Sequence, residues 1–210
     1  MDEQIFFAVN GAHNIFLDQM MILLTGKVVW VPLYVSLLYV VWRNYSWRGA
    51  VGVLLMVGIG MLFTDMLNSQ VIRPWIGRLR PSNPDNPIAP LVHIVNGRYG
   101  NGCGFPSAHS ANMWMLTFVM AHWLRNYALS FSMAVLTLLI CYSRVYLGYH
   151  YPGDILGGLV WAFIVVYVLR YIHIRYVRFT AVANPVMTWV PVTVICATLL
   201  YMLIYSVIEI

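Results

Sequence analysis

Charged residues are scarce in this 210-residue chain, where Asp, Glu, Lys and Arg together make up only 9%. Soluble domains usually carry about 25%, so this scarcity excludes an ordinary soluble protein. Hydrophobic residues make up 61% of the chain, and the mean hydropathy is positive. The composition therefore predicts an integral membrane protein whose partners are membrane lipids and not nucleic acid.

Cysteines and linkers are also few. The three cysteines are an odd number, and two of them lie in apolar runs, which excludes a disulfide framework; they are Cys103, Cys141 and Cys196. No Pro/Ser-rich linker, low-complexity tract or 20–50-residue repeat divides the sequence. Asp2 and Glu3 stand where a secretory signal peptide would have a basic start. We therefore expect a single domain over residues 1–210 that keeps its amino terminus.

Long apolar runs are abundant. A membrane-spanning helix needs about 17–25 apolar residues, and six such runs lie near residues 25–42, 49–67, 107–124, 127–142, 155–172 and 186–208. Residues 5–24 are apolar too, but polar side chains interrupt them, which favours an interfacial or partly inserted helix. The sequence thus predicts an all-α, polytopic transmembrane bundle of about six spans.

Arginine marks one side of this bundle. The loops on that side carry arginine and no acidic residue, at Arg43, Arg48, Arg125, Arg170, Arg175 and Arg178. By the positive-inside rule these loops are cytoplasmic. We therefore expect a protein of the bacterial inner membrane whose other face, with both termini, opens to the periplasm or the exterior.

Charged residues on that other face fall into three short strings. They are Arg73 to Arg80-Pro81, Pro106-Ser107-Ala108-His109, and Ser143-Arg144 followed by His150 and Asp154. Ionisable side chains at membrane depth are energetically unfavourable, so where they occur they usually mark a functional site. Arginine forks match phosphate oxygens, so the three strings indicate an externally facing phosphate site.

The central string precedes an apolar run that ends at Leu124. Pro106 followed by Ser107 suits the first turn of a helix, where free N–H groups and the positive end of the dipole attract anions. Ser107 and the Ala108 N–H would then contact the anion, with His109 beside it. The alternative is that this string merely starts a membrane helix.

The arginines divide into two groups. Arg73 and Arg80 flank a short segment and are expected to hold phosphate. Arg78 and Arg98 have no motif partner, and for them we expect the common arrangement in which the stem is buried and the charged head reaches the lipid headgroups.

The third string places a carboxylate shortly after a histidine. Pro152 and Gly153 indicate a turn between His150 and Asp154. A carboxylate that accepts the N–H of one ring nitrogen fixes the tautomer and frees the other nitrogen to attack. Asp154 would orient His150 in this way, although aspartate is also a favoured helix N-cap, and the two roles are compatible.

Together, the three strings resemble the signature of the type 2 phosphatidic acid phosphatase family, within the vanadium-dependent haloperoxidase superfamily. That signature reads Lys-x6-Arg-Pro, Pro-Ser-Gly-His and Ser-Arg-x5-His-x3-Asp, and the resemblance covers the motif core 73–154. Two positions depart from it. Arg73 replaces the lysine with a wider fork, and Ala108 replaces the glycine while keeping its N–H.

The resemblance implies a metal-independent and cofactor-free lipid phosphatase. In it, His150 attacks phosphorus to form a phosphohistidine, Asp154 orients His150, and His109 protonates the leaving oxygen. The implied phosphate-binding residues are Arg73, Arg80, Ser107, Ala108 and Arg144. The implied substrate is a lipid phosphate, with undecaprenyl diphosphate, phosphatidylglycerol phosphate, phosphatidate and the phosphates of lipid A all open.

Selection among these lipids is expected from the loop 82–104, which is rich in polar residues and in glycines that would give it mobility. Two other functions fit parts of the pattern. A transporter or channel would also hold Arg, His and Asp inside a bundle, but we find no inverted repeat. A vanadate-binding haloperoxidase has the same constellation, but those enzymes are largely soluble. The sequence predicts no oligomeric state.

Overall fold

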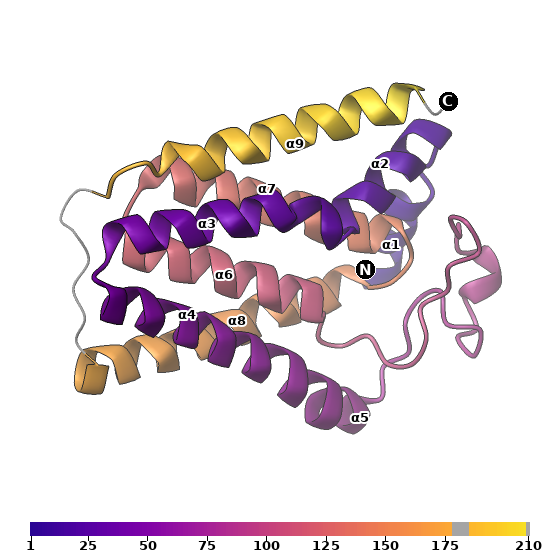
Figure 1. Cartoon of the computed structure of the whole chain (residues 1–210). Coiled ribbons are helices and arrows are strands. Elements are labelled where there is room, and N and C mark those ends of the chain that lie inside the picture. Colours follow the sequence, from indigo (N-terminus) through magenta and orange to yellow (C-terminus); the bar gives the residue numbers. More distant parts are fainter. Residues whose placement is uncertain (178–184, 209–210) are drawn as a thin grey trace.

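The computed structural model describes residues 1–177 and 185–208, with the side chains of residues 176 and 177 left out (Figure 1). Nearly all of the secondary structure is helical. The helices are α1 Asp2–Asn10, α2 Ile15–Thr25, α3 Val31–Asn44, α4 Trp47–Leu62, α5 Arg73–Ile76, α6 Ala108–Leu124, α7 Tyr127–Tyr146, α8 Pro152–Ile172 and α9 Trp189–Ile208. Among the described residues there is no β-strand, only an isolated bridge between Leu79 and Cys103. The all-α prediction is confirmed.

Each of the six predicted spans coincides with a helix of the bundle. Four helical stretches are long and apolar enough to cross a membrane: Trp47–Ile76, Tyr127–Tyr146, Pro152–Arg175 and Trp189–Ile208. A fifth crossing results if the bent pair Ile15–Thr25 and Val28–Asn44 counts as one span. The remaining segment is α6, which has 17 residues and therefore stands at the lower limit of about 17 for a span.

The second span runs further than predicted. We expected it to end near residue 67, but a π-helical segment, Phe63–Ile72, continues α4 directly into α5. The helix therefore carries Arg73 at its far end, because the chain stays helical until Gly77 adopts a left-handed conformation with φ of 67°.

The amino-terminal segment forms two helices where we expected one. Gly11 to Asn14 break it, and the Asn14 side chain caps α2 by accepting the Leu17 N–H at 2.8 Å. The axis then turns by 63° between α2 and α3. In Figure 1, α1 and α2 lie at the end of the bundle where the long loop after α5 also lies.

Helix α6 lies at the centre, and α8 packs closely against it. A Cβ added at Gly158 would lie 2.6 Å from the Ser107 carbonyl oxygen, and one at Gly157 would lie 2.6 Å from the Phe105 ring. The Ser110 hydroxyl donates to the Ile155 carbonyl at 2.8 Å. Small residues permit such close helix approach in membranes, so the starts of α6 and α8 are held in a fixed register.

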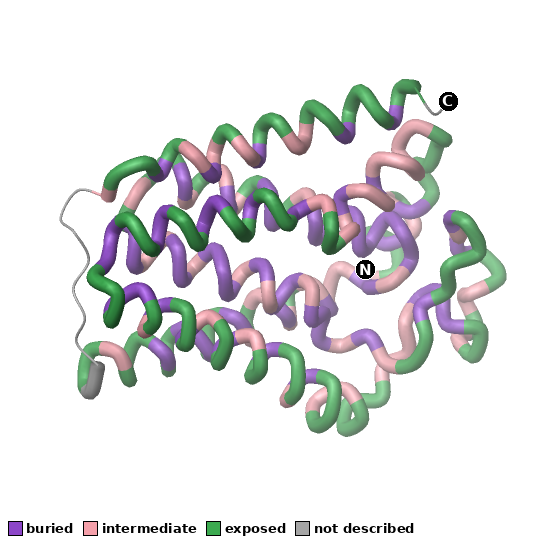
Figure 2. Tube along the Cα trace, in the orientation of Figure 1, coloured by how far each residue is buried: buried purple, intermediate pink, exposed green. Residues whose placement is uncertain are grey.

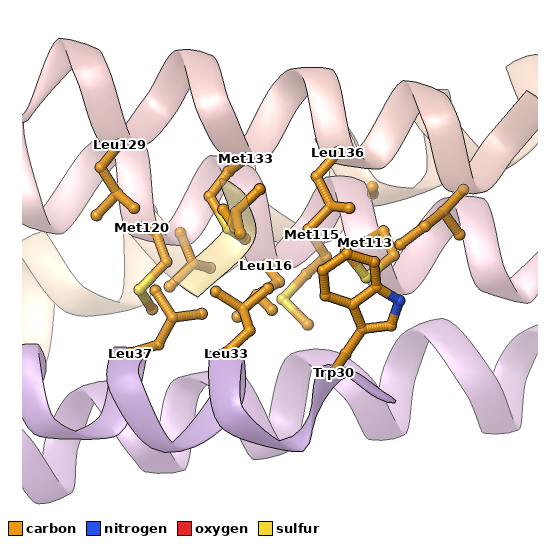
Figure 3. Close-up of a cluster of buried hydrophobic side chains, with 14 of the residues drawn as sticks. Trp30, Leu33, Leu37, Met113, Met115, Leu116, Met120, Leu129, Met133 and Leu136 are labelled. Atoms are coloured by element: carbon orange, nitrogen blue, oxygen red, sulfur yellow. The ribbon is translucent and has the colours of Figure 1, made fainter. Parts of the chain in front are cut away.

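The core is apolar and the outer surface is apolar as well. Figure 3 shows Trp30, Leu33 and Leu37 of the α3 side facing methionines and leucines of α6 and α7. In Figure 2 the outward faces of α4 and α9 are mostly exposed. Large apolar side chains such as Leu55 of α4 and Leu200 of α9 lie there, and Phe163 of α8 is exposed as well. A soluble fold would bury most of these side chains, whereas lipid tails solvate them.

The arginine-rich turns lie at the end of the bundle opposite to the motif strings. The α3–α4 and α6–α7 turns and the end of α8 are at the left of Figure 1, whereas the long loop and the carboxyl end of α9 are at the right. Arg178 lies outside the described residues. The fold therefore separates the two sets of charges along the bundle axis, as the sequence predicts.

Candidate active site

The three motif strings meet around one cavity of about 690 Å³. Its charged end is lined by six of the eight predicted site residues, contributed by α5, α6, α7 and the intervening loops: Arg73, Arg80, Ala108, His109, Arg144 and His150. The structure thus gathers residues up to 77 positions apart in the chain into one site.

Ser107 and Asp154 lie directly behind this lining and are fully buried. Ser107 is the N-cap of α6, and its hydroxyl accepts the Ser110 N–H at 3.4 Å. Its own N–H donates to the Asp154 carbonyl at 2.9 Å. The predicted helix start is therefore present, except that Pro106 precedes the N-cap instead of lying in the first turn. Contact of Ser107 with phosphate stays a prediction.

His150 and Asp154 lie side by side in the protein interior, with 1% and 0% of their surface exposed. His150 Nδ1 is 3.5 Å from Asp154 Oδ2, which is longer than a well-formed hydrogen bond. The same Oδ2 accepts the Tyr151 N–H at 2.9 Å. Catalytic hydrogen bonds are often long before substrate binds, so the pair is positioned for Asp154 to orient the imidazole.

The segment between these two residues differs from our expectation. Pro152 and Gly153 do not form a separate turn but open α8, with Tyr151 as N-cap and Asp154 in the first helical turn. Proline suits this place because the first N–H groups of a helix have no partner within it. Asp154 therefore caps α8 through the Tyr151 N–H and also faces His150, and its orienting role stays a prediction.

The electrostatic environment disfavours the charged form of His150. Complete burial lowers the pKa of His150 well below its usual value, and the nearby cations Arg144, Arg80 and Arg73 lower it further. Burial and the neighbouring Arg73 likewise lower the pKa of Arg80, but arginine remains charged in proteins. A neutral imidazole beside several guanidinium groups has the properties of a nucleophile in an anion site.

Each motif arginine is held in place by a contact within the protein, and Arg80 donates through Nε to the Cys103 carbonyl at 3.4 Å. Arg73 donates through Nε and Nη2 to the Pro106 carbonyl, at 3.3 and 3.2 Å. Arg144 donates to the Thr25 hydroxyl at 2.6 Å and lies 4.1 Å from the Tyr149 ring centre. Fixed forks lose little entropy when they bind an anion, so this end of the cavity is organised to receive one.

The interpretation of Arg78 was wrong. We expected it to reach the lipid headgroups, but its Nη1 lies 3.0 Å from Asp154 Oδ1 and its Nη2 lies 2.5 Å from Asp2 Oδ2. The guanidinium also covers the Tyr151 ring at 4.0 Å. Sequence reasoning missed the Arg78–Asp154 contact because the two residues are 76 positions apart in the chain. Arg98, by contrast, is exposed.

The polar residues of the loop 82–104 lie apart from the cavity lining. Asn10 of α1 donates to the His93 carbonyl at 3.1 Å and accepts the His93 N–H at 2.9 Å. The His93 ring meets Asp18 of α2 at 3.1 Å and stacks on His13. Within the described chain, no residue between 81 and 107 lines the cavity. This loop is therefore clamped to the amino-terminal helices.

The cavity lining instead includes polar residues that sequence reasoning did not select. They are Thr25, Lys27, Asp65 and Asn112. Lys27 lies between α2 and α3. It is a charged residue inside the apolar run 25–42, the first predicted span, and nothing in the sequence explained its charge there. That charge was the available signal for a polar edge to the cavity.

Gly104 offers a local test of the geometry. A Cβ at this position would lie 2.9 Å from Asp154 Oδ2, 3.2 Å from the Arg80 side chain and 3.5 Å from His150 Nδ1. The first distance is shorter than real Cβ contacts, so Asp154 would have to move. We expect Gly104→Ala to lower kcat about tenfold or more, because displaced catalytic groups commonly cost as much as 10²-fold.

Gly58→Ala is the matched control for this substitution. Gly58 lies within α4, and a Cβ there meets nothing within 4 Å. Phosphate release by the two purified variants is the measurement, and full activity in Gly104→Ala would contradict the tight packing around Asp154.

Comparison with known proteins identifies the family. The sequence profile of the PAP2 superfamily matches residues 49–178. The chain is 43% identical to a lipid A 4'-phosphatase of Bacteroides thetaiotaomicron over 160 residues, which cover 76% of this chain and 71% of the relative. It is 28% identical to a lipid A 4'-phosphatase of Porphyromonas gingivalis over 166 residues, covering 79% and 70%.

A solved structure shares the fold. It is the transmembrane PAP2-type phosphatidylglycerolphosphate phosphatase of Bacillus subtilis, with a TM-score of 0.58, 24% identity and coverage of 84% of this chain and 86% of that one. The profile match covers more than half of the sequence and includes all three motif strings, and the relatives extend across most of the chain. This chain therefore belongs to the PAP2 superfamily and is one of its multi-pass membrane lipid phosphatases.

Proposed function

We propose that this protein removes a phosphate from lipid A by way of a phosphohistidine at His150. The observation that carries the proposal is the shape of the cavity, which has the charged motif residues at one end and an apolar chamber at the other. A site for a soluble phosphate ester would need only the charged end. A lipid phosphate needs both.

The apolar chamber lies between α3, α4 and α6. Its lining is formed by large aliphatic and aromatic side chains, namely Trp30, Tyr34, Leu37, Leu38, Val41, Leu54, Val57, Met61, Met113, Leu116 and Met120. Five of them, on the α3 and α6 sides, appear in Figure 3. Pockets of about 300–1,000 Å³ suit organic ligands, so the chamber is large enough to admit part of an acyl chain beside the phosphate.

The proposed reaction uses this chain's own residues in two steps. The nitrogen of His150 that does not face Asp154 attacks phosphorus, and the bond from phosphorus to the lipid oxygen breaks. His109 gives its proton to that leaving oxygen. His109 then takes a proton from water, which attacks the phosphohistidine, releases phosphate and restores His150.

Charge on the transferred phosphoryl group is balanced by arginine. Arg73, Arg80 and Arg144 line the same end of the cavity, and positioned cations stabilise the charge that builds up in such a transition state. We therefore expect activity to persist in a chelator such as EDTA. Arg73 in place of the family lysine keeps the charge, and its fork rests on the Pro106 carbonyl.

Among the four lipids, lipid A is the substrate favoured by similarity. Two relatives that match across most of the chain are lipid A 4'-phosphatases. The 4'-phosphate of lipid A is thus the first group to test. Undecaprenyl diphosphate, phosphatidylglycerol phosphate and phosphatidate are the competing candidates.

The proposed sidedness places the site on the outer face of the inner membrane. It follows from the arginine-rich turns at the opposite end, which the positive-inside rule assigns to the cytoplasm. The amino terminus lies at the site end, because Asp2 contacts Gly153 and Arg78. An alkaline phosphatase reporter fused after residue 208 should be active, and an active cytoplasmic reporter there would reverse the orientation.

The test of substrate is phosphate release by purified protein in detergent, with the four lipids supplied at equal concentration and His150→Ala as control. We expect lipid A to have the highest kcat/KM and the mutant to release nothing. Preference for another of the four lipids would replace lipid A as substrate but keep the chemistry. Protein-dependent flux in reconstituted vesicles, without phosphate release, would favour the transport alternative.

A further inference from the structure

Helix α1 reaches the site from outside the matched family region. Asp2 contacts Arg78, and its second oxygen accepts the Gly153 N–H at 2.8 Å. Gly153 lies in the first turn of α8, where the N–H groups have no partner within the helix and attract a negative charge. One carboxylate of α1 therefore contacts both the helix that carries Asp154 and the arginine that pairs with Asp154.

Arg78 joins the two carboxylates. Its Nη1 faces Asp154 and its Nη2 faces Asp2, and the Tyr151 ring supports the guanidinium plane. Arg78 itself is 31% exposed, whereas the Asp154 side chain is completely buried. A long, partly exposed side chain keeps one geometry only where its contacts fix it. Asp2 and Tyr151 supply those contacts.

The orientation of Asp154 depends on this chain of contacts. Oδ1 binds Arg78, while Oδ2 accepts the Tyr151 N–H and faces His150. Without Arg78, Oδ1 would lose its cation in a buried place. A buried charge without its partner is unfavourable, so the carboxyl group would rotate or take up a proton. In either case it would orient His150 less well.

We propose that Arg78 is a positioning residue for the reaction at His150, and that Asp2 of α1 positions Arg78. This inference rests on the proposed function, because it assigns the Asp2–Arg78–Asp154 chain to the same chemistry. Arg78 lies outside the cavity lining, so it acts through Asp154 and not on the phosphate. The amino-terminal helix is then part of the catalytic apparatus.

If the contacts between α1 and α8 had only a structural role, variants of Asp2 and Arg78 would give a different result. Loss of the contacts would then lower the stability and the amount of folded enzyme, but each folded molecule would retain its turnover. Positioning lowers kcat at unchanged KM and leaves the inhibition constant of inorganic phosphate unchanged, because Arg73, Arg80 and Arg144 still bind the anion. Partners that orient a metal ligand typically contribute about 10–100-fold, and we expect the same range for a partner that orients a nucleophile.

The experiment compares Arg78→Gln, Arg78→Lys, Asp2→Ala and the double variant, with active sites counted by phosphoenzyme labelling. We expect Arg78→Gln to lower kcat about 10–100-fold, Arg78→Lys to recover part of it, and Asp2→Ala to have a smaller effect. The loss in the double variant should be smaller than the sum of the two single losses, because Asp2 acts in part through Arg78. Glu3→Ala, on the exposed side of α1, and Arg48→Gln, at the opposite end of the bundle, are the matched controls.

Unchanged kcat in Arg78→Gln, or losses that add in the double variant, would overturn the inference. Wild type and His150→Ala are assayed in parallel. If wild type releases phosphate and His150→Ala does not, the proposed function stands whatever Arg78 does. If neither releases phosphate from any lipid, the proposed function fails first.

Discussion

His150→Ala is expected to release no phosphate from any lipid and to form no phosphoenzyme. The substitution removes the only side chain of the site that the mechanism uses as nucleophile, and the three arginines cannot replace it because they are permanently charged donors. Binding should survive, since those arginines still line the cavity. The measurement is a single-turnover assay with labelled substrate, together with a binding assay for inorganic phosphate.

His122→Ala is the matched control for this loss. His122 lies in the last turn of α6, and 13 residues of helix separate it from His109, or about 20 Å at 1.5 Å per residue. Removing an imidazole there should leave turnover intact. Residual turnover by His150→Ala at the wild-type rate would show that another group attacks phosphorus.

His109→Ala is expected to slow lipid dephosphorylation by about 10²–10⁴-fold, the usual contribution of a general acid or base. His109 follows Ala108 in the first turn of α6 and lines the charged end of the cavity. A lipid alkoxide leaves poorly without a proton, whereas a nitrophenolate leaves readily without one. The loss in the rate of phosphoenzyme formation should therefore be large with a lipid phosphate and much smaller with an aryl phosphate, because only this first step depends on the leaving group.

This dependence on the leaving group separates catalysis from folding. A variant that is merely misfolded loses both activities to the same extent. Equal losses in the rate of phosphoenzyme formation with the two substrates would contradict a proton-donating His109.

The motif residues could be predicted because their spacing is a property of the sequence. Four helix ends and two loops carry them, and the neighbouring apolar runs predict the helices. The start of α6 after Ser107 and the start of α8 near Asp154 follow from local capping chemistry. The limits of these helices were therefore within reach of sequence reasoning.

Contacts between distant segments were beyond that reasoning. Arg78 looked like an ordinary interfacial arginine because nothing near it in sequence signals Asp2 or Asp154. The bend between α2 and α3 is likewise a tertiary feature, and it brings Thr25 to Arg144. Segments that looked separate, the amino-terminal helices and the motif core, are thus parts of one site.

The apolar residues that line the cavity, and that would contact the substrate, could not be identified from the sequence either. Polarity suggested that the loop 82–104 contacts the substrate, but its polar side chains bond to α2, to Tyr151 or to nearby backbone groups. Asn83, for example, accepts the Asp85 N–H and donates to the Gly102 carbonyl. The apolar walls of α3, α4 and α6 line the chamber. Apolar residues in a membrane helix do not reveal from sequence whether they face lipid, core or substrate.

Trapping the phosphoenzyme tests the central claim most directly. Purified protein is mixed with lipid A labelled at its phosphates, quenched in alkali within one turnover, and digested for mass spectrometry. The account predicts a phosphoryl group on His150, stable in alkali and lost in acid, in a peptide that also contains Asp154. A phosphoryl group on any other residue, or lipid dephosphorylation with no phosphoenzyme at any time, would contradict it.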